Sequence, residues 1–89
     1  MTAVFEVLAE ENRRRILDLL VDDERHVGEL VERLSLSQPA VSKHLRVLRD
    51  AGLVEARTDA QRRLYRIRTE RNRQTMRTTL DRLGVALEG

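Results

Sequence analysis

The chain has 89 residues, which is enough for one domain, but a domain of this size buries only about 60–65% of its unfolded surface and would gain stability from a partner subunit. It has no cysteine, which excludes disulfides, thiolate metal sites and cysteine nucleophiles, and with two aromatic residues its core must be built from Leu, Val and Ile. The formal net charge is +2, but residues 1–34 carry −4, residues 35–68 carry +5 and residues 69–89 carry +1, so the middle third is the candidate phosphate-facing surface.

Two helices are predicted for the N-terminal part of the chain. Residues 3–9 are mostly apolar and are typical of a short helix. Asn12 has a side chain suited to capping a second helix. The core-facing stripe of that helix consists of Ile16, Leu17 and Leu20.

A third and a fourth helix follow, joined by a tight connection. The third is predicted to begin near His26, with Glu29 placed three residues later as in a capping box. Ser37 is the expected N-cap of the fourth, because Pro39 then falls in the first turn, where its missing N–H does no harm. Gly52 is suited to ending this helix.

The fourth helix is predicted to be amphipathic. Its apolar side carries Val41, Leu45 and Leu48. Its opposite side and flank are polar and basic, with Gln38, Pro39, Ser42, Lys43 and Arg46.

From Leu53 the apolar period changes from about four to two, which predicts a β-hairpin with strands at 53–57 and 62–68. On the second strand we expect Tyr65 and Ile67 to point inward, Arg66 and Arg68 outward, and Leu64 to be half covered. Thr69 can cap a last helix, and a heptad-like seam on that helix is formed by Met76, Leu80, Leu83 and Leu87.

This order of elements, α-α-α-α-β-β-α, predicts a single mostly helical domain over residues 1–89, with the winged helix-turn-helix fold. A B-form major groove admits one α-helix, and short polar side chains near the helix N-terminus can distinguish base pairs there. The predicted groove contacts are Gln38, Ser42, Lys43, His44 and Arg46. For His44 the alternative is a structural hydrogen bond, since it lies at the edge of the buried face.

Arginines outside the fourth helix are predicted to add contacts to phosphate. On the wing these are Arg57, Arg62 and Arg63, and the alternative is an ordinary charged hairpin face. Ser37 and Arg13 are further candidates. For Arg13 the reason is that a cation at the start of a helix opposes the helix dipole, so a phosphate neighbour would explain it. For the run of Arg13 and its two neighbours, ion pairing with the nearby acidic residues is the alternative.

The motifs also resemble a known family. The segments Leu8-Ala9, residues 13–17, residues 27–30 and above all residues 37–54 (SQPAVSKHLRVLRDAGLV) are similar to the ArsR family of bacterial repressors, over about three quarters of the chain. The resemblance implies a homodimer that binds a palindromic operator and represses its own operon. It implies that the first and last helices form the dimer interface, through Val4, Phe5, Leu8, Met76, Leu80, Leu83 and Leu87. For the last helix, burial in the domain's own core is the alternative.

The departures from the family pattern argue against metal sensing. The positions of the family's Cys pair carry His26 and Gly28, the last helix has no His, and His26 with Glu29 is too few ligands for a site. The wing tip has Ala60 where the family usually has Gly, so a distorted tip is expected. We therefore expect a branch of the family that binds no metal.

The composition also argues against an enzyme. The chain has two His and no Cys, no glycine-rich phosphate loop and no sign of converging carboxylates, so we expect no catalytic activity and no cofactor. No segment is apolar for long enough to span a bilayer, and the N-terminus has no basic region followed by an apolar stretch, so we expect a cytoplasmic protein without membrane contact. The alternative function is a winged-helix module for protein contact, or a regulator controlled by a partner protein or small ligand.

Overall fold

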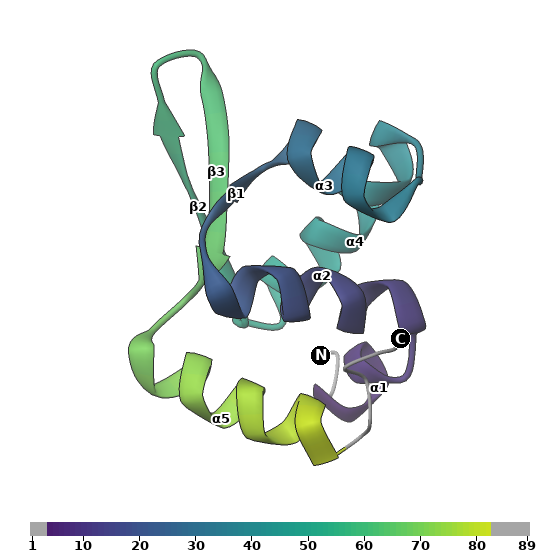
Figure 1. Ribbon diagram of the computed structural model, residues 1–89, viewed down its shortest axis with the longest axis vertical. Coiled ribbons are helices and arrows are strands. Elements are labelled where there is room, and N and C mark those ends of the chain that lie inside the picture. Colours follow the sequence, from purple (N-terminus) through teal and green to yellow (C-terminus); the bar gives the residue numbers. More distant parts are fainter. Residues whose placement is uncertain (1–3, 83–89) are drawn as a thin grey trace.

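Five helices and three short strands make up the part of the chain that the computed structural model describes, residues 4–82, without the side chains of Val4, Phe5 and Arg71 (Figure 1). In chain order they are α1 (Val4–Leu8), α2 (Glu11–Asp22), β1 (Arg25–His26), α3 (Val27–Leu34), α4 (Gln38–Asp50), β2 (Val54–Asp59), β3 (Arg62–Ile67) and α5 (Glu70–Arg82). The predicted class, four helices followed by a hairpin and a last helix, is confirmed. Strand β1 was not predicted, because two residues are too few to show the alternation of apolar and polar side chains that indicates a strand.

Helix α2 lies at the centre of the molecule, with α3 and α4 on one side and α5 on the other (Figure 1). The core is aliphatic, and each fully buried Leu or Ile contributes about 1.5–3 kcal/mol to it. Its fully buried side chains include the predicted stripes of α2 and α4, namely Ile16, Leu17, Leu20, Val41, Leu45 and Leu48. No helix within residues 4–82 combines the length and the apolar character that crossing a membrane requires.

The beginnings of the helices are determined by local capping. Glu10 caps α2 by accepting a hydrogen bond from the backbone N–H of Arg13 at 3.0 Å, so the prediction that Asn12 is the cap is wrong by two residues. His26 does hold the cap position of α3, but its side chain forms no capping hydrogen bond. The predicted capping box is also wrong, because Glu29 binds the guanidinium of Arg25 at 2.8 Å instead.

Helix α4 begins and ends as the sequence predicts. Ser37 is the N-cap, with its hydroxyl oxygen accepting from the N–H of Ala40 at 3.2 Å, and Pro39 lies in the first turn. The helix is followed by Gly52 at φ +78°, a backbone conformation that a side chain would strain.

The three strands form an antiparallel sheet in the order β1-β3-β2. Asp59 pairs with Arg62, so the hairpin turns through two residues, and the first of them, Ala60, takes φ +58°. A left-handed conformation costs a non-glycine residue about 1–2 kcal/mol. The distortion expected at this tip is therefore the backbone conformation of Ala60. Figure 1 shows the hairpin projecting from the helices, at the end of the molecule opposite α5.

Candidate nucleic-acid interface

The exposed side of α4 presents the polar residues that the sequence predicts for groove contact. Gln38, Ser42, Lys43 and Arg46 are all exposed, because the apolar stripe of the helix holds the opposite side in the core. His44 differs: it is half-buried, and its Nδ1 is enclosed without a hydrogen-bond partner in the described part of the chain. Helix α4 therefore presents four of the five predicted side chains together on one accessible surface.

The outer face of the wing (β2, β3 and the loop between them) carries neutralised arginines. Arg57 and Glu24 lie 2.6 Å apart between Nη2 and Oε1, and Arg66 and Glu55 lie 2.7 Å apart between Nε and Oε2. The hydrogen bond from Arg57 holds the pKa of Glu24 below its usual value, and Glu24 in turn raises the pKa of Arg57. The charge of Arg57, which the sequence assigns to DNA contact, is thus already compensated within the protein.

The face of the sheet that carries this ion pair also carries Leu64. Arg57 is the cross-strand partner of Leu64, so their side chains share one face of the sheet. Since β3 lies between β1 and β2, the pair from Glu24 to Arg57 spans β3 on this face. Leu64 is only 7% exposed and lies outside the main core cluster, so the prediction that it is half covered is wrong.

The tip of the wing carries two exposed arginines. Arg62 and Arg63 are exposed, and neither takes part in the ion pairs found among the described residues. The guanidinium carbon of Arg63 lies 5.9 Å from the centre of the Tyr65 ring, within the range of a cation–π contact. These two arginines leave a net positive charge next to α4.

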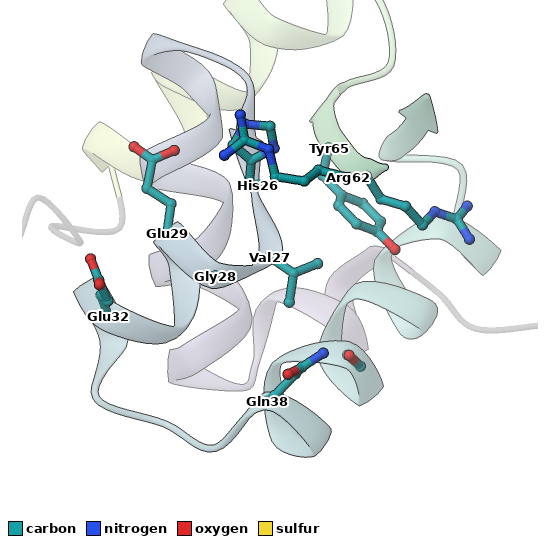
Figure 2. Close-up of a pocket in the computed structure, with 10 residues that line it drawn as sticks. His26, Val27, Gly28, Glu29, Glu32, Gln38, Arg62 and Tyr65 are labelled. Atoms are coloured by element: carbon teal, nitrogen blue, oxygen red, sulfur yellow. The ribbon is translucent and has the colours of Figure 1, made fainter. Parts of the chain in front are cut away.

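An open groove of about 800 Å³, here called the wing groove, separates this tip from the helices (Figure 2). One wall consists of Arg62, Arg63 and Tyr65 of β3. The opposite wall consists of His26, Val27, Gly28, Glu29 and Glu32 at β1 and α3, with Gln38 and Ser42 of α4. The groove therefore joins the predicted recognition surface to the tip arginines.

Arg13 makes hydrogen bonds within the protein, and its predicted contact to phosphate stays a prediction. Its Nε donates to the backbone carbonyl of Val7 at 2.9 Å, and Nη1 of Arg14 donates to the carbonyl of Leu8 at 2.7 Å. The last carbonyls of a helix lack partners within the helix, and cations are favourable there. The arginines thus satisfy the end of α1, which neither sequence alternative anticipated. The hydroxyl of Ser37, another predicted phosphate contact, caps α4, and its phosphate contact stays a prediction.

The predicted dimer residues that the structure describes are buried in the protomer itself. Leu8 is 9%, Met76 5% and Leu80 1% exposed, and all three belong to the main core cluster. Burial in the domain's own core is therefore the alternative observed for Met76 and Leu80. The side chains of Val4 and Phe5, together with Leu83 and Leu87, lie outside the described residues.

The described residues contain no group of three or more His, Cys, Asp or Glu side chains arranged to hold a metal ion. Of the two residues weighed as half of a metal site, Glu29 is bound to Arg25. His26 borders the wing groove with its Nδ1 enclosed.

Comparison with known proteins identifies the family. A family model described as bacterial regulatory protein, arsR family, matches residues 10–56, from α2 into β2. The transcriptional activator HlyU of Vibrio cholerae is 48% identical over 62 residues, which are 70% of this chain and 57% of HlyU, so the chain matches little more than half of that relative's length. The transcriptional repressor SdpR of Bacillus subtilis is 32% identical over 69 residues, 78% of this chain and 77% of SdpR.

A solved structure agrees with these relatives over most of the chain. It is the homodimeric winged helix-turn-helix DNA-binding domain Mb0332 of Mycobacterium bovis, with a TM-score of 0.83 and 32% identity, covering 91% of this chain and 75% of that one. The predicted fold and the resemblance stated from the motifs are confirmed. The chain belongs to the ArsR family of bacterial regulatory proteins and has a winged helix-turn-helix fold.

Proposed function

We propose that the protein binds double-stranded DNA in a sequence-specific manner as a homodimer, and that it represses its own operon from a palindromic operator in the cytoplasm. In this proposal the exposed side of α4 lies in the major groove, and the tip of the wing contacts the flanking backbone. The observation that carries it is the continuity of the surface: Gln38 and Ser42 of α4 border the same groove as Arg62 and Arg63, which form no ion pair within the described part of the chain.

The proposed dimer places α1 and α5 between the two copies. Both helices lie at the end of the molecule opposite the wing tip, so contact there leaves both DNA-facing surfaces free (Figure 1). Mb0332 is described as homodimeric, which supports the same state here. Because Met76 and Leu80 are already buried, the contact on α5 must use exposed residues such as Thr75 and Thr78.

In the proposed repression, the protein bound at the promoter blocks access to it. SdpR is named a transcriptional repressor, which supports repression here, whereas HlyU is named a transcriptional activator. Two α4 helices related by a twofold axis would read half-sites about 10–10.5 base pairs apart from centre to centre, or a multiple of that spacing.

A footprint on the promoter of the protein's own operon, combined with transcription in vitro, tests the proposal. We expect two protected half-sites with inverted sequence and a transcript that decreases as protein is added. A transcript that increases would replace repression by activation. No protection at any protein concentration would favour the alternative of a protein-contact module.

Substitutions on α4 test the specificity part of the proposal. Ser42→Ala or Gln38→Ala should weaken binding to the footprinted site by about 1–3 kcal/mol for a lost base contact, and should weaken binding to random duplex much less. Gln74→Ala, at an exposed position on α5 outside the wing groove, is the control for a general loss of surface polarity. Equal losses on both kinds of DNA would show that α4 does not read bases.

A further inference from the structure

The hydroxyl of Tyr65 is not explained by the fold. The residue is only 7% exposed, so its ring belongs to the core, yet it borders the wing groove. Figure 2 shows the hydroxyl oxygen directed toward α4. It takes part in none of the side-chain hydrogen bonds found within the described residues, and it is not one of their enclosed polar atoms, so it is open to the groove and free to bind a ligand there.

Gly28, on the opposite wall of the wing groove, is equally unexplained. It is the second residue of α3, and glycine in a helix is about 0.5–1 kcal/mol less favourable than alanine. A Cβ built on Gly28 would meet no atom within 4 Å, so packing within the described chain does not require glycine here. A glycine without an internal reason is suited to the close approach of another molecule's backbone.

The geometry of DNA binding indicates which molecule that is. With α4 in the major groove and the wing tip at the neighbouring backbone or minor groove, one sugar-phosphate strand has to pass between them. The wing groove is the open space in that position, and Arg62 and Arg63 supply complementary charge. Of the two acidic residues that line the groove, Glu29 is paired with Arg25, and Glu32 belongs to the α3 wall, across the groove from Arg62 and Arg63.

We propose that the wing groove holds the sugar-phosphate backbone of one DNA strand, with the Tyr65 hydroxyl donating a hydrogen bond to a phosphate and Gly28 allowing the strand to approach α3. The inference rests on the proposed DNA binding and adds two contact residues to it. Both contacts are to the backbone and are independent of base sequence.

Two variants separate this role from a structural one. Tyr65→Phe removes one oxygen and keeps the ring, so thermal unfolding should be unchanged while the affinity for specific and random duplex falls about 10-fold alike. The dependence of affinity on salt should stay that of the wild type, because no charge is removed.

Gly28→Ala should move stability and binding in opposite directions. The added methyl group favours the helix and has free space in the unbound protein, so the melting temperature should rise, while DNA affinity should fall several-fold. The matched control is Ser35→Gly at the other end of α3, where φ is +56°: it should also raise the melting temperature, but leave DNA affinity unchanged.

A duplex with single phosphates replaced by uncharged methylphosphonate identifies the contact. For one position in each half-site, the replacement should weaken the wild type and have little further effect on Tyr65→Phe. Wild-type affinity in Tyr65→Phe or in Gly28→Ala would show that the wing groove does not hold the DNA backbone. The same conclusion would follow if the loss from Tyr65→Phe and the loss from the phosphate replacement added fully at every phosphate. Failure of the wild-type protein to bind any duplex would instead refute the proposed function itself.

Discussion

Replacing Arg63 by Gln should flatten the salt dependence of DNA binding, whereas removing the Arg57–Glu24 pair should not. The two arginines differ in whether an acidic side chain neutralises their charge. Arg63 has no acidic partner among the described residues, and Arg57 has one at 2.6 Å. Only a cation that displaces counterions from phosphate contributes to the slope of log affinity against log salt.

The expected size follows from counting phosphates. Each neutralised phosphate contributes about 0.9 to the slope, and a homodimer carries the substitution twice, so Arg63→Gln should reduce the slope by about 1.8. Between about 50 and 200 mM salt the wild type should therefore lose about 12-fold more affinity than the variant. The double variant Glu24→Gln/Arg57→Gln, which leaves net charge unchanged, should keep the wild-type slope.

Fluorescence anisotropy of a labelled duplex, titrated at four salt concentrations, measures these slopes directly. Equal flattening in the Arg63 variant and the double variant would show that Arg57 contacts phosphate despite its pairing. A wild-type slope for Arg63→Gln would remove the wing tip from the interface.

Three further outcomes follow from the structure. Leu80→Ala should lower the free energy of unfolding by about 2–5 kcal/mol in urea titrations without changing the mass of the assembly, whereas dissociation with an unchanged protomer would show that Leu80 lies at a subunit contact. Ala60→Gly should raise the melting temperature, corresponding to about 0.5–1 kcal/mol after the entropy of glycine is subtracted, and an unchanged or lower value would contradict the strain assigned to the tip. Burial, and then the charges of Asp22 and Asp81, raise the pKa of Asp18 above 3.8, so ionisation costs stability as pH rises through that range. Asp18→Asn should therefore stabilise the protein slightly at about pH 7 and not at about pH 3 in thermal unfolding, and a stabilisation that is the same at both pH values would refute this origin.

Helix α4 could be predicted from the sequence because the residues that determine its ends and its buried side lie within or next to it. Ser37, Pro39 and Gly52 mark its two ends within the segment itself, and its stripe of Val and Leu determines which side is exposed. The hairpin was predictable for the same reason, since the change of period at Leu53 is a property of neighbouring residues.

The roles of charged side chains were less predictable because they depend on distant partners. Arg57 is neutralised by Glu24, 33 positions earlier in the chain, and only the strand order brings the two together. Arg13 is explained by carbonyls at the end of α1, a contact that requires the angle between α1 and α2. The hydroxyl of Tyr65 has no signature in a sequence pattern that correctly predicts its ring to point inward.

Disulfide cross-linking can show whether the exposed side of α4 lies in the major groove, because the chain has no cysteine and an introduced thiol is the only one in each protomer. A duplex that carries a thiol tether on a major-groove base edge within the footprinted half-site is combined with Ser42→Cys, or with Gln74→Cys on the exposed side of α5 as control. If α4 lies in the major groove, Ser42→Cys should cross-link efficiently and Gln74→Cys should not cross-link. Cross-linking through position 74 and not through position 42 would show that α4 does not lie there.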